Sequence, residues 1–400
     1  SPDIDFVMSP SRYADRGLGG GSGFMTTVDS VKLHKKLYID QADIRTFRAT
    51  GPGGQLARLN TIKDTVSVLE REFSNTVVNG VAAQWYDFNN GWILGDKRLT
   101  QAIGKMHQIE TTLQHSPRET MDAQNSIAVI LNEKSILYTK VDSMIQDAAV
   151  SREIDQLNRS GVAWDNYLLS DFPKIGKYRY YLFLNCFNLT ADQKRQIEYL
   201  KKDGNVLVFV GTPGIINQGD KSTFAQAAID PSVVSKMTGF NVKQIADGPL
   251  VTTIEGSNPI AQNLTGKTYG DASVTGPRFA AQDGVKLGHF SDNDSTSLAI
   301  KKFDNWTSIY SAAPTLPAAL LRNIAKVADV PVINNYDGDI TYVSKNLFAV
   351  HSLTGGERAF TVGKQYETAK ELFSDRAYAV KNGQFTMQVP EAGTVLFLLQ

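Results

Sequence analysis

Polar side chains follow directly on a short apolar run near residue 40. Residues 37–39 are apolar, and the residues after them include Asp40, Asp43 and Arg45. A buried parallel strand that ends at a polar pocket has this pattern, and barrel enzymes carry their catalytic groups at such strand ends. Asp40 is therefore a candidate catalytic carboxylate, with capping of a following helix as the alternative. Asp43 and Arg45 are expected to form an ion pair across a loop or to contact substrate.

A second apolar stretch, residues 77–84, reads as a strand and ends in aromatic residues and an aspartate. These residues are Trp85, Tyr86, Asp87 and Trp92. Aromatic rings stack on the C–H faces of sugars, and carboxylates accept hydrogen bonds from sugar hydroxyls. The pattern predicts that Trp85 and Trp92 contact a carbohydrate. Core packing is the alternative for Trp85, and Trp92 is expected to be the more exposed of the two.

Two arginines, Arg12 and Arg16, precede a glycine-rich loop over residues 17–23. The loop lacks the Lys-Ser/Thr ending of a phosphate-binding loop, so we expect a mobile loop over a pocket. At least one of the two arginines is expected to bind a substrate hydroxyl or carboxylate. The alternative is that both arginines brace the loop.

The composition argues against several classes of function. The 400 residues include 41 basic and 41 acidic side chains, five histidines and a single cysteine, Cys186. Zero net charge disfavours binding to nucleic acid or to a membrane surface, and no apolar run reaches the roughly 18 residues of a membrane span. The histidines are scattered without a metal-binding pattern. We therefore expect no metal or other cofactor, while one cysteine leaves the redox compartment open.

Residues 1–115 alternate between predicted strands and helices. Strands are expected over the first eight residues, at 36–40 and up to Trp85, and helices after Thr61 and at 98–113. The first helix carries an apolar residue at every third or fourth position, which gives one apolar face. Repeated strand–helix units predict a parallel sheet or barrel. The chain has no initiator methionine and begins close to a core strand, so we expect a fragment of a longer polypeptide.

A second domain is expected over residues 116–333, after a polar linker at 116–125. Its predicted strands lie at 127–131, 164–169, 180–184 and 206–210. Its predicted helices lie at 142–158, 191–202 and 317–328, and Thr190 with Gln193 forms a capping box before the second of them. The alternation predicts a doubly wound, flavodoxin-like sheet, with an irregular stretch in the last hundred residues of the domain.

The last part of the chain, residues 334–400, shows short strands separated by turns. The strands are expected at 340–343, 347–351, 358–362, 377–380, 384–389 and 394–399. Asn382-Gly383 is a strong signal for a hairpin turn. The pattern predicts a small antiparallel β domain, so the whole chain reads as α/β with three parts.

This three-part layout resembles the carboxyl-terminal part of glycoside hydrolase family 42, a family of β-galactosidase-like proteins. The stretches that carry the resemblance are SPSRYADRG (9–17), KLYIDQADIRT (36–46), QWYDFNNGW (84–92), FLNCFNLT (183–190) and LPAALLRNIAKVADV (316–330). The resemblance implies the end of a (β/α)8 TIM barrel, then a flavodoxin-like domain related to class I glutamine amidotransferases that mediates trimerisation, then a small β domain. It also implies a carbohydrate substrate, a β-galactoside, whose glycosidic bond the parent protein hydrolyses.

The resemblance also assigns roles to residues. Asp40 falls in the slot of the nucleophile at the end of the seventh barrel strand, where the family has glutamate, and a register one residue later places Gln41 there. The general acid/base of the family follows the fourth strand and would lie upstream of Ser1. Because retaining hydrolysis needs two carboxyl groups roughly 5–5.5 Å apart, this chain alone is expected to be inactive.

Two other functions stay open. One is a catalytically degenerate relative that binds carbohydrate or serves as an assembly module. The other is a remote one, an amidotransferase-like hydrolase with Cys186 as nucleophile. A nucleophile elbow needs small neighbours, and the residues around Cys186 include Asn185, Phe187 and Asn188, so a buried, inert thiol is the default.

Overall fold

The structure is a computed structural model that describes residues 3–51, 56–88, 91–217 and 228–400. The chain divides into two compact units, and each is described by itself. Unit 1 is drawn from Ser1–Asp122, Leu157–Ala163 and Val332–Gln400, and unit 2 from Ala123–Gln156 and Trp164–Pro331. The expected α/β class is confirmed as a mixed fold with one large mixed sheet and smaller sheets.

Unit 1 begins with a three-stranded parallel sheet in the order β1-β2-β3. Its elements are β1 (Phe6–Pro10), α1 (Val28–Leu33), β2 (Leu37–Ala42), α2 (Ile62–Asn79), β3 (Ala82–Trp85) and α3 (Lys97–His115). Residues 1–2 of the expected first strand lie outside the described residues. β2 runs two residues beyond its expected end, so Asp40 lies within the strand, paired with Ser9 on β1 and Ala83 on β3.

Helix α2 forms where the apolar spacing predicts a helix. The Thr61 side chain accepts a hydrogen bond of 3.0 Å from the Asp64 amide, which satisfies one unpaired donor of the first turn. Gly80 ends the helix in the left-handed conformation, with φ of 64°. Of the two starts expected for the next strand, Val77 is wrong because α2 continues to Asn79, whereas Val81 lies one residue before the start of β3.

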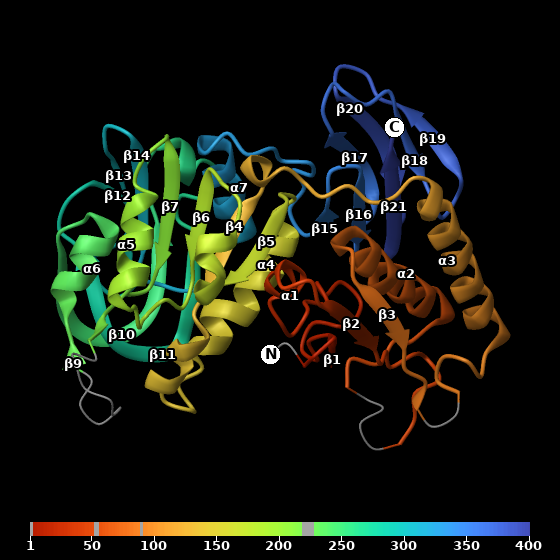
Figure 1. Ribbon diagram of the computed structural model, residues 1–400, viewed down its shortest axis with the longest axis horizontal. Coiled ribbons are helices and arrows are strands. Elements are labelled where there is room, and N and C mark those ends of the chain that lie inside the picture. The colour runs from red at the N-terminus through yellow and green to blue at the C-terminus, as the bar shows by residue number, and fades with distance from the viewer. Residues whose placement is uncertain (1–2, 52–55, 89–90, 218–227) are drawn as a thin grey trace. The chain divides into compact units, whose positions relative to one another are not determined.

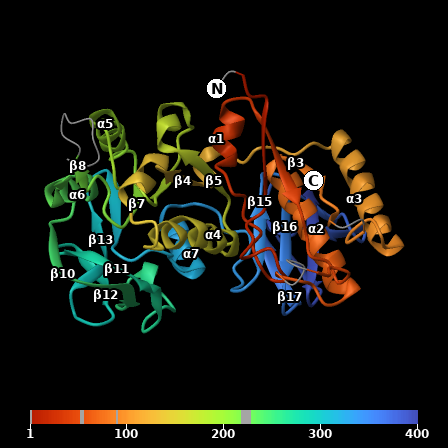
Figure 2. The same ribbon diagram turned by 90° about the horizontal axis from the view of Figure 1, so that it is seen from below.

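The carboxyl-terminal strands of unit 1 form a five-stranded antiparallel sheet, β15-β16-β21-β18-β19, and a separate pair, β17-β20. Their bounds are β15 (Ile340–Val343), β16 (Leu347–Ser352), β17 (Gly356–Thr361), β18 (Thr368–Glu371), β19 (Arg376–Ala379), β20 (Gln384–Val389) and β21 (Gly393–Leu399). Six of these were expected, and β18 was missed. Residues from α2, α3, β15, β16 and β21 share one apolar core, and Figure 2 shows α2 lying along β15 and β16.

The Asn382-Gly383 turn forms, with φ of 54° and 79° at its two residues, as a tight turn of this type requires. The strands that flank it do not pair with each other as an ordinary hairpin would. β19 pairs with β18, whereas β20 pairs with β17. The turn therefore carries the chain from one sheet into the other.

Unit 2 is built on a nine-stranded sheet in the order β11-β10-β12-β13-β14-β7-β6-β4-β5. The strands are β4 (Ile127–Leu131), β5 (Trp164–Leu168), β6 (Tyr180–Phe183), β7 (Asn205–Val210), β10 (Val242–Ile254), β11 (Thr268–Ala281), β12 (Val285–Phe290), β13 (Thr296–Lys302) and β14 (Trp306–Ser311). The four expected strands, β4 to β7, pair in parallel, and β14 adds in parallel beside β7. The other four strands add antiparallel. Figure 1 shows the sheet end to end.

The remaining elements of unit 2 are helices, short turns and one small strand pair. They are η2 (Ala123–Asn125), η3 (Glu133–Tyr138), η4 (Asp147–Ser151), η5 (Leu169–Lys174), α5 (Ala191–Tyr199), β8 (Ile216–Asn217), β9 (Ala228–Ile229), α6 (Pro231–Thr238), η7 (Pro259–Ala261) and α7 (Ala318–Val327); α4 (Arg152–Arg159) begins in this unit. Both bonds of the Thr190–Gln193 capping box are present. Figure 2 shows α5 and α7 on opposite faces of β4 and β7.

The helix expected at 142–158 is present but starts later, at residue 145, and runs through η4, a short π-helix, into α4. One expectation for this unit is wrong. The stretch expected to be irregular holds the long strands β10 and β11, of 13 and 14 residues. Their register shifts at Ile245/Gly248 and at Pro249/Leu250, and glycine and proline inside a strand hide its alternation.

Candidate functional site

The side chains of β2 alternate between two faces of the three-stranded sheet. Tyr38, Asp40 and Ala42 are buried, whereas Leu37 is 48% exposed and Gln41 is half-buried. Ala42 packs in the same core as α2 residues, so the buried face is the one that α2 covers. Because successive residues of a strand point to opposite faces, Asp40 faces α2 and Gln41 faces the open side of the sheet.

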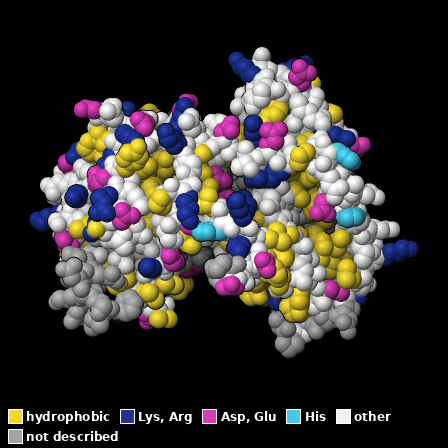
Figure 3. All heavy atoms as spheres, viewed as in Figure 1, with side chains coloured by type: hydrophobic (Ala, Val, Ile, Leu, Met, Phe, Trp, Pro, Cys, Tyr) yellow, Lys and Arg dark blue, Asp and Glu magenta, His cyan; other side chains and the backbone are white. Residues whose placement is uncertain are grey.

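The open face is apolar along the first strands and polar toward their carboxyl ends. Phe6 and Met8 on β1 are 52% and 43% exposed. Figure 3 shows hydrophobic side chains gathered where Figure 1 draws β2 and β3. Gln41 Nε2 donates a hydrogen bond of 3.2 Å to Gln84 Oε1 on β3, so two amides stand side by side at this edge.

The Asp40 carboxyl group lies beside a second carboxyl group, that of Glu72 on α2, and both residues are 1% exposed. Ser11 Oγ lies between them, 3.2 Å from Asp40 Oδ2 and 3.3 Å from Glu72 Oε2. Burial, followed by the charge of Glu72, raises the pKa of Asp40 to about 8. Asp40 is therefore protonated at neutral pH.

Arg71 compensates the charge of Glu72 from the same helix. Its Nε and Nη2 donate to Glu72 Oε1, with 3.1 Å for the Nε bond. The Glu72 Oε2 atom accepts a hydrogen bond of 2.6 Å from Ser22. A buried charge is tolerated where it is paired and hydrogen-bonded, and these contacts meet that condition for Glu72.

Arg71 also anchors the glycine-rich loop. Its guanidinium donates to the backbone carbonyls of Arg16, Gly17 and Gly20 at 2.7, 2.6 and 2.8 Å. A Cβ atom at Gly20 would lie 1.8 Å from the Asp15 carbonyl oxygen, so only glycine fits there. The expectation of a mobile loop over a pocket is wrong, because a buried arginine holds the loop against α2.

A second buried cluster joins two of the predicted site arginines. Asp43 accepts hydrogen bonds from Arg16 Nη1 at one carboxylate oxygen and from Arg45 Nη1, at 2.7 Å, at the other. The expected Asp43–Arg45 ion pair is therefore present. Arg16 is 1% exposed, and its guanidinium lies 3.6 Å from the centre of the Tyr13 ring. Within the described part of the chain, Arg16 Nε and Nη2 have no hydrogen-bond partner.

Aromatic rings surround Arg45. Its guanidinium lies 5.0 Å from the Phe88 ring centre and 5.8 Å from that of Trp92. Phe88 packs on Tyr86, with 4.6 Å between ring centres, and Tyr86 is 39% exposed. Tyr13 is 44% exposed. The exposed rings beside this arginine pair are thus Tyr13 and Tyr86, which the sequence interpretation did not single out as sugar contacts.

The remaining predicted site residues, Trp92, Trp85 and Arg12, lie in different surroundings. Trp92 is 5% exposed, so the expectation that it is the more exposed tryptophan is wrong. Trp85 is half-buried and packs against the apolar core that contains α2 and α3. Arg12 forms an ion pair of 3.7 Å with Asp15 rather than with Asp43. Residues 89–90 of the stretch between the tryptophans lie outside the described residues.

Glu72 was not identified from the sequence as a member of this site, and Gln41 entered only through a register shifted by one residue. Both could have been found from periodicity. Glu72 lies next to Phe73 on the buried side of α2, where a charged residue needs a partner. Gln41 follows Leu37 and Ile39 at strand spacing.

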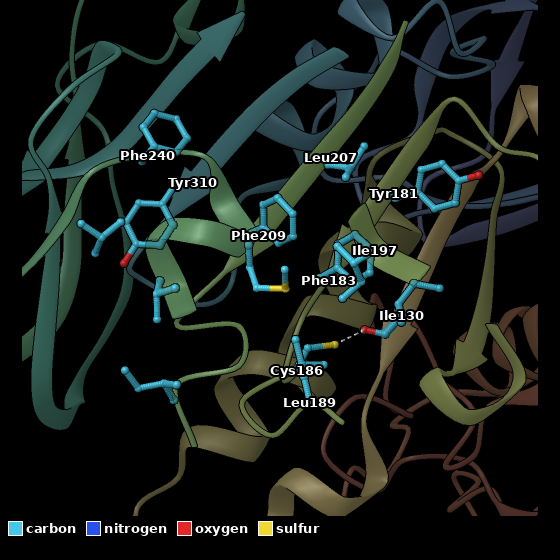
Figure 4. Packing of buried hydrophobic residues seen from close by; sticks show 14 of the residues in the cluster. Ile130, Tyr181, Phe183, Cys186, Leu189, Ile197, Leu207, Phe209, Phe240 and Tyr310 are labelled. Carbon is cyan, nitrogen blue, oxygen red and sulfur yellow. Dashed lines mark hydrogen bonds between the residues drawn. The ribbon is translucent and has the colours of Figure 1, made fainter. Parts of the chain in front are cut away.

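Cys186 in unit 2 lies within an apolar cluster. Figure 4 shows it beside Leu189, with its thiol directed at the Ile130 carbonyl oxygen, 3.8 Å away. Burial raises the pKa of the Cys186 thiol, so the reactive thiolate is disfavoured. This environment fits the inert thiol that the sequence favours.

Two general properties concern the described residues alone. No group of three or more His, Cys, Asp or Glu side chains among them could hold a metal ion. No helix within the described ranges is long and apolar enough to cross a membrane.

No protein-family model and no curated protein sequence matches the chain, but solved structures do. The β-galactosidase from Rahnella sp. R3 matches with a TM-score of 0.67 at 12% identity, over 100% of this chain and 60% of that one. Gan42B, a GH42 β-galactosidase from G. stearothermophilus, matches with a TM-score of 0.58 at 10% identity, over 84% and 51%. α-L-Fucosidase isoenzyme 2 from Paenibacillus thiaminolyticus matches with a TM-score of 0.56 at 11% identity, over 96% and 64%.

These matches establish a glycosidase-like fold. The resemblance to family 42 is confirmed at the level of fold, by β-galactosidase structures that share little sequence with the chain. The chain spans 51–64% of the length of the three solved structures. Because proteins with one fold host different functions, the fold alone assigns no substrate and no reaction to this chain.

Proposed function

We propose that this chain is the carboxyl-terminal part of a glycoside hydrolase-like protein. In this proposal, residues 1–115 are the last strands and helices of a (β/α)8 barrel, 116–333 a flavodoxin-like trimerisation domain and 334–400 a carboxyl-terminal β domain. The parallel pairing of β1–β3, the five parallel strands of unit 2 and the β-galactosidase matches support it. A carbohydrate is the partner that this architecture favours.

We further propose that the site of unit 1 binds a carbohydrate and that Asp40 does not attack it. The observation that carries this proposal is the direction of the Asp40 side chain, which lies on the α2 face and is 1% exposed. A nucleophile must reach the sugar and must be ionised. Asp40 fails on both counts, because burial and Glu72 raise its pKa to about 8.

The groups that suit sugar binding lie on the other cluster. Arg16 is 1% exposed and its guanidinium lies 3.6 Å from the centre of the Tyr13 ring, so it supports that ring and does not contact the sugar itself. Tyr13 is an exposed ring on this cluster, and Tyr86 is an exposed ring that packs on Phe88 beside Arg45. Both rings suit the C–H face of a sugar. Asp43 holds both arginines in place, so its role is to position them.

Hydrolysis by the longer protein is the second candidate function, and the glycosidase matches favour it. The alternation of β2 places Gln41, not Asp40, on the open face at the strand end. Glutamine carries no negative charge and cannot act as a nucleophilic carboxylate. Gln41→Glu restores a carboxyl group at this position.

Calorimetric titration of the full 400-residue chain with methyl β-galactoside and with fucose tests the binding proposal. We expect saturable binding of one sugar, weakened about fivefold by Tyr13→Ala, because an aromatic contact contributes roughly 0.5–1.5 kcal/mol. Tyr199→Ala is the matched control, since Tyr199 is an exposed tyrosine of unit 2. Absence of saturable binding, or equal binding by the Tyr13 variant, would refute carbohydrate binding at this cluster.

Hydrolysis of nitrophenyl β-galactoside by the wild type, Asp40→Asn and Gln41→Glu decides the role of the two strand residues. We expect no turnover by the wild type and none by Asp40→Asn. Turnover that Asp40→Asn abolishes would establish Asp40 as the nucleophile and overturn the proposal. Turnover gained only in Gln41→Glu would show that Gln41 occupies the position of the missing carboxylate.

A further inference from the structure

Unit 2 contains a cavity of about 420 Å³ at the carboxyl ends of its parallel strands. Leu184, Val210 and Ala312, which directly follow or end β6, β7 and β14, line one side. Strands β10 and β11 line another side with Leu250 and Phe279. Open α/β sheets bind ligands outside the carboxyl ends of their strands, so this cavity has the expected location of a ligand site.

Small residues at the strand ends keep the cavity open. Gly211 follows β7 with φ of 72°, and a Cβ atom there would lie 3.1 Å from the Phe187 ring. The residues after β14 are also small, with Ala312 and Pro314 in the lining. Larger side chains at these positions would fill the space that the strands leave.

The neighbouring edge of the same sheet is filled by amide side chains. Asn185 Oδ1 accepts a hydrogen bond of 2.8 Å from the Asn132 amide, and Asn185 Nδ2 donates to Gln146 at 3.0 Å. This network lies between β4 and β6, where the strand order reverses. The space for a ligand is therefore displaced from the reversal point toward β7 and β14.

The lining is mainly apolar and contains three aromatic rings in its interior. These are Phe187, Phe279 and Tyr310, and all three are buried. The Tyr310 hydroxyl already donates a hydrogen bond of 3.0 Å to the Phe279 carbonyl oxygen, so Tyr310 offers its ring rather than a donor. A cavity of about 150 Å³ lined by apolar side chains can hold benzene, so this one accommodates a ring with a substituent.

One end of the lining is polar and positively charged. Thr139, Lys140 and Ser143 contribute to it, and Lys140 is exposed. Of the described residues that line the cavity, Lys140 is the one charged residue, so no acidic side chain of the lining opposes it. An ammonium group at the solvent end of an apolar cavity favours a ligand with one anionic group.

We propose that this cavity binds a small carboxylate that carries an aromatic ring. The ring lies among Phe187, Phe279 and Tyr310, and the carboxylate points to Lys140. The proposal is independent of the carbohydrate site, because none of the residues it uses belongs to unit 1.

Titration of the full chain with 4-phenylbutyrate and with its neutral analogue 4-phenylbutan-1-ol tests the proposal by calorimetry. We expect the carboxylate to bind about fivefold more tightly than the alcohol, which is the range of a partly exposed ion pair. Lys140→Met removes the ammonium group but keeps an unbranched side chain, and it should remove this preference. Lys134→Met is the matched control, because Lys134 is an exposed lysine on η3 outside the lining.

Filling the cavity separates binding there from adsorption to other apolar surfaces. Ala312→Leu and, independently, Ala149→Leu add volume at two lining positions, and each should weaken both probes at least tenfold. Circular dichroism identifies a variant that fails to fold. The remaining folded variant then shows whether binding depends on the cavity. No saturable binding to the wild type, or unchanged binding in a folded cavity-filling variant, would overturn the proposal.

Discussion

The carboxyl ends of parallel strands have opposite chemistry in the two units. In unit 1 this region is filled with buried ionisable groups, where Asp40, Glu72 and Arg71 form one cluster and Asp43 joins Arg16 and Arg45 in another. In unit 2 the corresponding region of β6, β7 and β14 is an apolar cavity. The same strand geometry therefore supports either arrangement.

The difference shows what each arrangement requires of the sequence. Buried charges must be compensated, so unit 1 places Arg71 next to Glu72 and brings a glycine-rich loop within reach of the same guanidinium. A cavity requires only that large side chains be absent at a few positions, so unit 2 has Gly211 and Ala312 there. The stability of unit 1 should therefore be sensitive to the loss of a buried charge, and the stability of unit 2 to added volume at its cavity.

The largest effect is expected from Arg71→Met. This substitution leaves Glu72 buried without a cation and removes the donor that holds three loop carbonyls. Removing one partner of a buried ion pair typically costs about 3–5 kcal/mol, and urea unfolding of the purified protein measures the loss. Arg98→Met, at an exposed arginine paired with Asp96, should change stability little. Equal effects of the two substitutions would contradict the role given to Arg71.

The next effect concerns the pH dependence of stability. Because the folded-state pKa of Asp40 is raised to about 8, from about 3.9 in an unfolded chain, folding takes up a proton between these values. The contribution to stability is complete below about pH 4 and is lost as pH rises through about 8. It amounts to at most about 6 kcal/mol, since one pKa unit corresponds to about 1.4 kcal/mol.

Asp40→Asn should therefore flatten the fall in unfolding free energy between pH 4 and 8, as measured by urea unfolding at several pH values. Part of the slope will remain, because burial also raises the pKa of Glu153 to about 8. Asp64→Asn controls for the loss of one acidic group elsewhere on α2. A slope in Asp40→Asn that equals that of the wild type would show that Asp40 is ionised in the folded protein.

A smaller loss of stability is expected at the cavity of unit 2. Gly211→Ala forces an alanine into the left-handed conformation and places its Cβ 3.1 Å from the Phe187 ring. Gly204→Ala has a similar φ of 76° with nothing within 4 Å of the new atom. The second substitution should cost about 1 kcal/mol from the backbone alone, and the first should cost more. Equal losses of stability in thermal unfolding would mean that the Phe187 ring moves aside at no cost in free energy.

Local patterns predicted the elements whose signals lie within one segment. The start of α2 after Thr61 and the capping box at Thr190 formed as expected, because such bonds join residues three or four positions apart. The long strands β10 and β11 escaped prediction, since glycine and proline interrupt their alternation and pairing with distant residues stabilises them.

The candidate site was predicted in part for the same reason. The Asp43–Arg45 pair joins near neighbours and was expected. Asp40 on the strand and Glu72 on the helix are 32 positions apart in the sequence. A local sequence pattern does not predict a contact over that separation. The burial of Trp92 and the anchoring of the glycine-rich loop likewise depend on packing with segments that are distant in sequence.

Unit 1 is drawn from three separate chain segments, with most of unit 2 between them. The core of α2 and α3 includes Leu347 on β16 and Leu396 on β21, which the ribosome adds more than two hundred residues later. At roughly 5–20 residues per second, the apolar face of α2 waits on the order of tens of seconds for these partners during synthesis. The early segment must therefore stay soluble, or be shielded by a chaperone, until the last strands emerge.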